Sequence, residues 1–274
     1  MKGEYRRSER RACQLAGVGR SSYRYPARRR QDKELRRRLR ELAGERRRSG
    51  YRRLTVLLRR EGWPVNHKRV YRIYGEEGLA VRRRQRKRRK AAARTRLVLP
   101  TRSNQVWTMD FTHDELASGR KFRTLNLMDG YTREAPAIEV DTSLPGLRVV
   151  RVLEKVARQR GYPEAIQVDH GPEFISRGVD QWAFERGVEL PFIEPGKPTQ
   201  NAQIESFNGK FRDECLNENW FLSLPEAREK IEAWRRDYNQ ARPHSALGYQ
   251  TPEEFAARAA ARGASPPTPL ALLT

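Results

Sequence analysis

Apolar residues recur at helical spacing in the stretch NAQIESFNGKFRDECL, residues 201–216. Four of them share one stripe of the predicted helix: Ile204, Phe207, Phe211 and Cys215. Three polar residues share nearly the opposite face: Glu205, Asn208 and Arg212. The helix can therefore bury its phenylalanines while it presents a carboxylate and a guanidinium on its other side. Taken alone, this pattern is also typical of an ordinary solvated helix face.

After Pro100 the pattern changes to an alternation of apolar and polar residues, which predicts β-strands. Three such segments are separated by turn residues and form an expected antiparallel meander: 104–115, 121–130 and 135–141. Helices and short strands then alternate: helix 144–161, strand 164–171, helix 175–187, strand 188–194 and the helix 201–216. A long helix over 224–247 and a short one over 251–258 follow. This order predicts an α/β fold with the mixed sheet of the ribonuclease H type.

Only helices are predicted before residue 82. Residues 51–79 fit a helix-turn-helix, with a stripe of leucines, a break at Gly62, Trp63 and Pro64, and a second helix capped by Asn66. A recognition helix of this kind inserts its outward residues into DNA. The outward residues of the second helix are His67, Lys68, Arg69 and Arg72. We therefore expect an all-α basic DNA-binding region ahead of the ribonuclease H-like domain.

The chain divides into five expected segments. They are a basic helical segment with a weaker helix-turn-helix candidate (1–48), the helix-turn-helix (49–81), a basic linker (82–100), the catalytic domain (101–258) and a tail expected to be disordered (259–274). The weaker candidate covers residues 8–25, and an arginine-rich helix is predicted over 33–48.

The charge of the chain is uneven. The formal net charge is +23, and residues 1–100 hold 35 lysines and arginines against 9 acids. The remaining residues hold 22 basic residues against 25 acids, so the whole basic excess lies in the first 100. A polyanion is the natural partner, because each neutralised phosphate releases condensed counterions. A basic half attached to a slightly acidic one suggests DNA binding in the first and chemistry in the second.

Several classes of protein are excluded by composition. The chain has no apolar run long enough to span a membrane, and its first residues lack the apolar core of a signal peptide. Two distant cysteines and four scattered histidines supply neither a disulfide framework nor a zinc ligand set. We expect a cytoplasmic protein associated with the nucleoid and not with a membrane.

Three acids are placed for catalysis by the predicted topology. Asp110 lies within the first strand, Asp169 at the end of a short buried strand, and Glu205 on the helix described above. A ribonuclease H sheet brings these positions together, and three close carboxylates stay ionised only when cations hold them. Oxygen ligands favour Mg²⁺, for which Mn²⁺ can substitute. Two such ions would clamp the attacking and leaving oxygens of a phosphoryl displacement.

Three motifs, VWTMDFT, VDHGPEF and NAQIESFNGKFRDECL, resemble the signature of bacterial insertion-sequence transposases in the DDE (retroviral-integrase) superfamily. More narrowly, the chain is similar to the second-frame (OrfB) product of insertion-sequence family three. As in the Asp-Asp-(35)-Glu pattern of that family, 35 residues lie between Asp169 and Glu205, and a basic residue, Arg212, follows seven positions later. The segments 51–79 and 238–255 resemble the flanking parts of the same family, so the resemblance spans residues 51–255.

This resemblance implies a DNA transposase that cleaves strands and transfers 3′-OH ends of an insertion sequence, with the terminal inverted repeats and target DNA as double-stranded partners. It also implies a homodimer or higher oligomer, and a partner or fusion from the upstream frame (OrfA). His170 departs from the family, which has asparagine or glutamine there more often. Four residues near the carboxylates are candidates for DNA contacts: Arg212, Lys210, Asn208 and His170. Packing on the helix surface explains Asn208 equally well, and a passive replacement is the favoured interpretation of His170.

Other residues have more ordinary interpretations. Asp114, Glu115 and Asp129 lie near turns and are expected at the surface. Three tryptophans are expected in the core: Trp107, Trp182 and Trp234.

Two other functions stay open from the sequence alone. The chain could be a DNA-binding repressor of transposition without catalysis, or a nuclease of the same fold that cuts without joining. The intact set of three acids argues against the repressor, and the residues do not separate the nuclease from the transposase.

Overall fold

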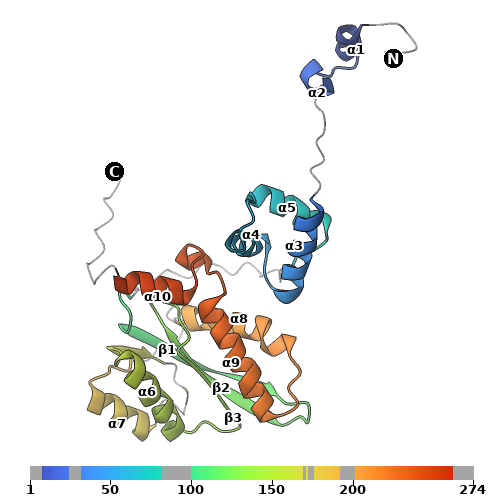
Figure 1. Cartoon of the computed structure of the whole chain (residues 1–274). Helices are drawn as coiled ribbons and strands as arrows, with labels where there is room; N and C mark the ends of the chain where they lie inside the picture. The colour runs from blue at the N-terminus through green and yellow to red at the C-terminus, as the bar shows by residue number, and fades with distance from the viewer. Residues whose placement is uncertain are drawn as a thin grey trace, which may run out of the picture.

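The computed structural model describes residues 8–24, 32–81, 100–168, 171, 176–191 and 201–261. In Figure 1 a group of helices from the first part of the chain lies beside a sheet that carries helices on both faces. No helix among the described residues is both long and apolar enough to cross a membrane.

The helix-turn-helix is confirmed, and a third helix packs with it. The three helices are α3 (Lys33–Glu45), α4 (Tyr51–Arg60) and α5 (His67–Glu76). Each contributes buried side chains to one core, led by Leu39, Leu54 and Ile73. The Asn66 side chain accepts a hydrogen bond from the backbone N–H of Lys68 at 2.9 Å, as expected of an N-cap. Ahead of this unit, α1 (Glu9–Leu15) and α2 (Arg20–Arg24) flank a short turn.

The sheet has the mixed topology predicted for the ribonuclease H type. Its described strands are β1 (Val106–Glu115), β2 (Lys121–Asp129), β3 (Ala137–Asp141) and β4 (Ala165–Gln167), in the order β3-β2-β1-β4. The first three form the antiparallel meander, and β4 runs parallel to β1. Of the expected strand 188–194, the described part makes one parallel bridge between Glu189 and Ala165.

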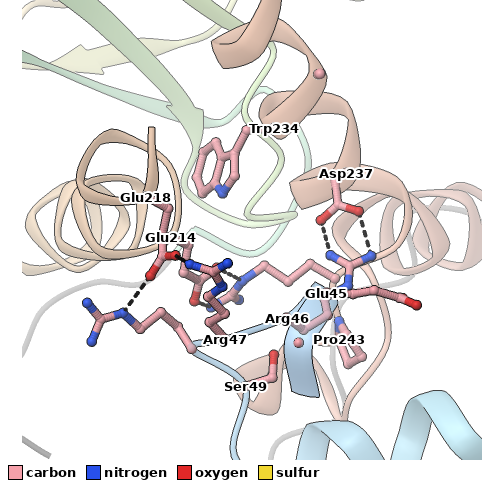
Figure 2. Close-up of a pocket in the computed structure, with 13 residues that line it drawn as sticks. Glu45, Arg46, Arg47, Ser49, Glu214, Glu218, Trp234, Asp237 and Pro243 are labelled. Carbon is pink, nitrogen blue, oxygen red and sulfur yellow. Dashed lines mark hydrogen bonds and ion pairs between the residues drawn. The ribbon is translucent and has the colours of Figure 1, made fainter. Parts of the chain in front are cut away.

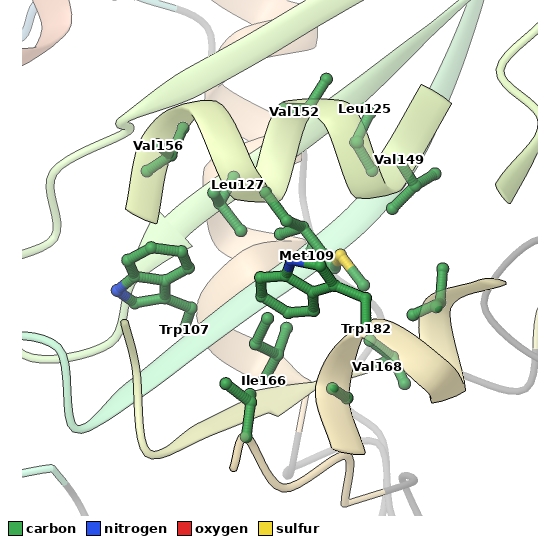
Figure 3. Close-up of a cluster of buried hydrophobic side chains, with 14 of the residues drawn as sticks. Trp107, Met109, Leu125, Leu127, Val149, Val152, Val156, Ile166, Val168 and Trp182 are labelled. Atoms are coloured by element: carbon green, nitrogen blue, oxygen red, sulfur yellow. The ribbon is translucent and has the colours of Figure 1, made fainter. Parts of the chain in front are cut away.

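Alternation along the strands separates two cores. Trp107 and Met109 of β1 pack against α6 (Gly146–Arg160) and α7 (Arg177–Arg186), as Figure 3 shows. On the other face, Phe122 and Met128 of β2 pack against α8 (Ala202–Glu214) and α9 (Leu224–Gln240). Asp110 lies between Met109 and Phe111, which both belong to the first core, so its own side chain belongs to the opposite face, which α8 covers.

Two predicted helices end earlier than their patterns suggested. α8 stops at Glu214 and a turn of 3₁₀ helix, η1 (Leu216–Glu218), follows it. α9 stops at Gln240, because Pro243 cannot continue a helix and restricts the residue before it. The segment beyond forms η2 (Ser245–Leu247) and then α10 (Pro252–Ala261). The tryptophan predictions hold: Trp107 and Trp182 are buried, and Trp234 packs half-buried against the second core.

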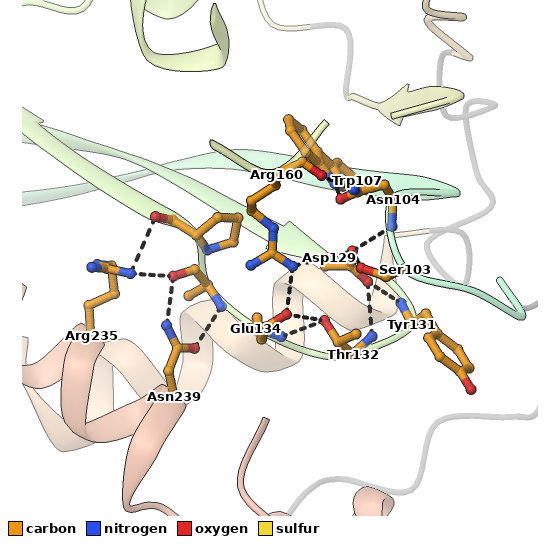
Figure 4. A network of polar contacts seen from close by, with 12 residues as sticks. Ser103, Asn104, Trp107, Asp129, Tyr131, Thr132, Glu134, Arg160, Arg235 and Asn239 are labelled. Atoms are coloured by element: carbon orange, nitrogen blue, oxygen red, sulfur yellow. Dashed lines mark hydrogen bonds and ion pairs between the residues drawn. The ribbon is translucent and has the colours of Figure 1, made fainter. Parts of the chain in front are cut away.

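Asp129, expected at the surface, is fully buried, and that expectation is wrong. Its Oδ1 accepts hydrogen bonds from the backbone N–H groups of Tyr131 and Thr132, both at 2.9 Å. Its Oδ2 accepts from the backbone N–H of Asn104 at 2.9 Å and from the Ser103 hydroxyl at 3.3 Å (Figure 4). The carboxylate thus fixes the turn after β2 to the segment that enters β1.

Replacing Asp129 with alanine should destabilise the fold strongly, because several buried donors would lose their acceptor at once. We expect the free energy of unfolding in urea to fall by about 3 kcal/mol or more, since each unsatisfied buried group costs about 1–3 kcal/mol. Glu185→Ala on the exposed side of α7 is the control, with an expected change within about 0.5 kcal/mol. Equal effects of the two substitutions would contradict the role assigned to Asp129.

Candidate active site

Asp110 is held from two sides. It lies in the middle of β1, half-buried, and its Oδ1 accepts a hydrogen bond from the backbone N–H of Phe111 at 2.7 Å. Its Oδ2 accepts from the amide Nδ2 of Asn208 on α8 at 2.7 Å. Two donors on different elements therefore fix the orientation of this carboxylate.

The same hydrogen bond places Glu205 near Asp110. Glu205 and Asn208 are three residues apart on α8, and residues at this spacing have Cβ atoms about 5–6 Å from each other. Because Asn208 touches Asp110, Glu205 lies on the next turn of the helix beside the same strand. Its side chain is exposed, and it makes no hydrogen bond or ion pair with another described residue. Two of the three predicted acids are thus brought to one side of β1.

Asn208 has a structural partner that the sequence reasoning missed. The sequence left Asn208 between a DNA contact, which stays a prediction, and packing on the helix surface. In the structure its Oδ1 accepts a hydrogen bond from Asn126 of β2 at 2.8 Å. Asn126 is the cross-strand neighbour of Asp110 and bonds onward to the buried hydroxyl of Thr112. Thr124 completes this chain of polar side chains with bonds of 3.0 Å to Thr112 and Asn126. The sequence did hold one sign that Asn208 acts beside the carboxylates: it lies one turn after Glu205, on the same face of the helix.

Asp169 and His170 lie outside the described residues. The described range 100–168 ends at the buried Val168, directly after β4 has paired with β1 as far as Gln167 and Thr108. The described range therefore stops one residue before Asp169, directly after the strand that pairs with the strand of Asp110. Within the described ranges, no group of three acidic, histidine or cysteine side chains forms a metal cage.

Arg212 continues the polar face of α8 beyond Asn208. It is exposed and lies close enough to the half-buried Asp114 of β1 to influence it. Burial raises the pKa of Asp114, while the Glu115 backbone N–H and the Arg212 guanidinium act in the opposite direction. Asp114 was expected at the surface, and the structure places it half-buried.

The predicted recognition helix presents two kinds of basic residue. His67 and Lys68 are exposed at the start of α5. Arg69 and Arg72 instead form ion pairs with the buried Asp32, at 3.0 Å from Arg69 Nε and 2.8 Å from Arg72 Nη2. Burial by itself would raise the pKa of Asp32, but the two guanidinium groups hold it below its usual value.

The helix-turn-helix unit contacts the catalytic domain through arginine–carboxylate pairs. The segment 44–49 faces α8 and α9 across a cavity of about 530 Å³ (Figure 2). Arg46 makes two hydrogen bonds to Asp237 of α9, one of them 2.6 Å long. Arg48 reaches Glu218 at 3.3 Å. Further along, Arg60 of α4 bonds the Glu254 carboxylate at 2.7 Å.

Lys210, which we predicted to contact DNA, lies beside a second group of charges at this junction. Glu214, one turn further along α8, accepts two hydrogen bonds of 2.6 Å from Arg242 and one of 3.2 Å from Arg53 of α4. Arg242 also lies 3.1 Å from Nε2 of the buried His244. Arginine can only donate, so this ring nitrogen accepts and the imidazole is neutral. Burial and the neighbouring cations, Arg242 foremost, lower the pKa of His244 to about 2.

Comparisons with known proteins agree with this architecture. Sequence models of the integrase core domain match residues 100–198 and 186–252, and a model of an HTH-like domain matches residues 29–88. The chain is 55% identical over 260 residues to a 31.7 kDa protein of the insertion element IS407 from Burkholderia multivorans, covering 94% of each chain. It is 30% identical to the transposase InsD of an IS2 element from Escherichia coli, covering 83% of this chain and 80% of InsD.

A solved structure shares the fold at low sequence identity. A chain of the simian T-cell lymphotropic virus intasome, in complex with the PP2A regulatory subunit B56 gamma, superposes with a TM-score of 0.50 and 16% identity. The match covers 85% of this chain and 76% of that one.

The matches to the integrase core domain and to the HTH-like domain agree with the ribonuclease H-like sheet and the helix-turn-helix, and they define an enzyme of the integrase-core class, of polynucleotidyl transferase type. Within that class, the chain belongs to the bacterial transposases of insertion-sequence family three.

Asn208→Ala should weaken the attachment of α8 to β1, because it removes a donor from Asp110 and an acceptor from Asn126. We expect a loss of about 1–2 kcal/mol in the free energy of unfolding measured in urea. Asn217→Ala in the exposed part of η1 should change it by less than about 0.5 kcal/mol. If the two variants are equally stable, the hydrogen bonds of Asn208 contribute nothing to the fold.

The neutral His244 makes stability depend on pH. Its native pKa of about 2 lies below the unfolded value of about 6.5, so the unfolded chain binds the extra proton first. Stability contributed by this group is therefore complete above pH 6.5 and is lost as the pH falls. His244→Gln keeps an acceptor for Arg242, and should reduce the loss between pH 6 and pH 5 by about 1 kcal/mol. His67→Gln, at an exposed site, is the control. If both variants reduce the dependence of stability on pH equally, this account of His244 is wrong.

Proposed function

We propose that the chain catalyses metal-dependent cleavage of DNA at the ends of an insertion sequence, and transfer of the resulting 3′-OH ends to target DNA. The observation that carries the proposal is the 2.7 Å hydrogen bond between Asn208 and Asp110. It joins the helix of Glu205 to the strand of Asp110, so that two carboxylates share one side of the sheet. Asp169, the third acid of the proposed set, follows the strand next to β1 in the sequence.

The donor set suits a hard divalent cation. Asp110 and Glu205 supply carboxylate oxygens, and Asn208 keeps one oxygen of Asp110 in a fixed orientation. Oxygen ligands of this kind favour Mg²⁺ or Mn²⁺ over zinc. Asp110, Asp169 and Glu205 would hold two such ions, which supply charge stabilisation at the attacking and leaving oxygens of a phosphoryl transfer.

The protein side chains position the reacting groups. Asn208 orients Asp110, and the exposed carboxylate of Glu205 faces solvent where a DNA strand can approach. Arg212, two turns after Glu205 on the same face, can bind a non-bridging phosphate oxygen. His170, next to Asp169 in the sequence, is a second candidate for a phosphate contact.

The proposed reaction has two displacements at phosphorus. In the first, water attacks a phosphodiester, the bond to the 3′ oxygen breaks, and the strand is left with a free 3′-OH. In the second, that 3′ oxygen attacks a phosphodiester of the target and joins to its phosphorus, while the target's own 3′ oxygen leaves and takes up a proton. Neither step uses a covalent protein–DNA intermediate.

The helix-turn-helix and the basic charge support DNA as the partner of this chain. Double-stranded DNA, both the terminal inverted repeats and the target, is the proposed substrate, with exposed His67 and Lys68 among the contacts of the recognition helix. Synapsis of two ends requires a homodimer or higher oligomer. A product of the upstream frame (OrfA) is a further proposed partner, and the nucleoid in the cytoplasm is the proposed site of action.

Strand transfer tests the proposal directly. A 3′-OH-ended duplex taken from the DNA that flanks the gene is incubated with plasmid and Mg²⁺ or Mn²⁺. Wild-type protein is compared with Glu205→Gln, and the control is Glu229→Gln at an exposed position of α9. DNA binding is measured for all three proteins. We expect joining by the wild type and the control, at least 100-fold less joining by Glu205→Gln, and equal DNA binding.

The other outcomes separate the alternatives. Cleavage without joining indicates a nuclease. Metal-independent binding without cleavage or joining indicates a repressor or the need for the upstream-frame (OrfA) partner, and addition of that partner distinguishes the two. Joining that survives Glu205→Gln excludes Glu205 as a catalytic residue. Removal of the divalent cation with EDTA should abolish joining by every variant, and its return should restore the reaction.

A further inference from the structure

Polar side chains lie buried beneath α8, on a face of the sheet that is otherwise apolar. Side chains of β2 alternate between the two faces, so those of residues 122, 124, 126 and 128 share this one. Phe122 and Met128 belong to the second core, whereas Thr124 and Asn126 between them are polar and fully buried. Thr112 of β1, opposite Thr124 in the sheet, is 5% exposed. These three polar side chains are too deeply buried to contact DNA.

The hydrogen bonds of these side chains run in one direction, toward Asp110. Oδ2 of Asp110 accepts from Nδ2 of Asn208 at 2.7 Å, so the amide oxygen of Asn208 points the other way. That oxygen accepts from Nδ2 of Asn126 at 2.8 Å, which leaves the Asn126 oxygen to accept in turn. The Thr124 hydroxyl donates to it at 3.0 Å. Three consecutive donors thus point toward one carboxylate.

The two asparagine amides can only turn together. If the Asn126 amide were reversed, its oxygen would face the oxygen of Asn208, and Asn208 would have to reverse as well. The oxygen of Asn208 would then face the Asp110 carboxylate, and two acceptors repel each other. Thr124 holds the observed orientation, because its single hydrogen is donated to the Asn126 oxygen. The second N–H of Asn126 donates to Thr112, whose hydroxyl lies 3.0 Å from that of Thr124.

We call Thr112, Thr124, Asn126 and Asn208 the polar chain. Its presence is not required by the sheet, because β1 and β2 pair through their backbones. Buried polar groups add little net stability even when all are bonded, and apolar side chains of the same shape could replace them at little cost. A fully bonded polar network in a core does specify a single arrangement. The arrangement specified here ends at the carboxylate of Asp110.

We propose that Thr124 and Asn126 are positioning residues for the proposed reaction. Through Asn208 they hold the Asp110 carboxylate in the orientation that phosphoryl transfer requires. The inference rests on the proposed function for the role of Asp110. Neither residue touches the substrate, and each acts through the next side chain of the polar chain. Because hydrogen bonds in series strengthen one another, loss of the donor at Thr124 weakens the last bond, at Asp110.

Removal of one hydroxyl tests the polar chain with little change of shape. Thr124→Val keeps the branched side chain and removes the donor, and Thr124→Ser restores it. Asn126→Leu, which removes the middle of the polar chain, is a second variant. The matched control is Thr108→Val: Thr108 is also buried on this face of β1, and its hydroxyl contacts the Met128 carbonyl oxygen at 3.5 Å, outside the polar chain.

Strand transfer separates positioning from binding. We expect Thr124→Val and Asn126→Leu to reduce kcat about 10–100-fold, as is usual when a partner behind a metal-binding carboxylate is lost. KM for the DNA end should stay unchanged, because these buried side chains touch no DNA. Thr124→Ser and Thr108→Val should join DNA at nearly the wild-type rate. The urea midpoint is measured for every variant, and Thr124→Val should lower it no more than Thr108→Val does.

Hydrogen exchange of the Asn208 amide gives a second measurement, on the free protein. With ¹⁵N-labelled asparagine, the side-chain N–H signals of Asn208 are assigned by their absence in Asn208→Ala. Two hydrogen bonds hold this amide, so its hydrogens should exchange slowly in the wild type and in Thr108→Val. We expect exchange about 5–10-fold faster in Thr124→Val, as for the loss of about one hydrogen bond. Thr124→Ser should restore the slow exchange.

The outcomes separate the two proposals. If Thr124→Val and Thr108→Val reduce joining equally, the polar chain is only structural and this inference is wrong. It is also wrong if Thr124→Val speeds the exchange of the Asn208 amide and leaves kcat unchanged, or changes neither. A wild type that joins no DNA contradicts the proposed function and the catalytic part of this inference together. The exchange measurements then decide by themselves whether Thr124 fixes the amide of Asn208.

Discussion

The hydrogen bond from Asn208 to Asp110 connects the two halves of the catalytic domain. The β-meander supplies the aspartate, and a helix about a hundred residues later supplies the amide, so neither element alone makes a site. Asn126 extends the connection across to β2 and fixes which way the amide of Asn208 points. Apolar packing alone would allow α8 to slide along the sheet. This polar chain selects one register, and with it the distance between the two carboxylates.

Much of the fold was predictable because local patterns agreed with the final packing. Alternation from residue 104 onward gave the strands, and Asn66 marked the start of the recognition helix. What could not be predicted came from partners distant in the chain. Asp129 looks like a surface turn residue until the backbone donors around it are known, and nothing in the segment around Asn208 indicates its bond to Asn126. Long-range hydrogen bonds leave no periodic trace in a sequence.

The partners of the charged side chains were likewise not predictable from the sequence. The excess of arginine in the first 100 residues suggested DNA binding throughout, and composition cannot tell a guanidinium that faces DNA from one that is paired within the protein. Arg69 and Arg72 lie on the predicted recognition helix, yet both bond to the buried Asp32. Arg46 bonds to Asp237, almost two hundred residues away. Part of the basic excess therefore holds the protein together, and the remainder is available to a polyanion.

The ion pairs between the helix-turn-helix and the catalytic domain also constrain how these two parts can evolve. Three arginines of the helix-turn-helix unit each bond to an acid of the other domain: Arg46, Arg53 and Arg60. A substitution in one set therefore requires a matching substitution in the other. A chimera that joins the helix-turn-helix of one element to the catalytic domain of a distant relative would carry mismatched charges across this boundary. Recombination between elements should therefore succeed most readily when both domains, with their paired charges, are inherited as one block.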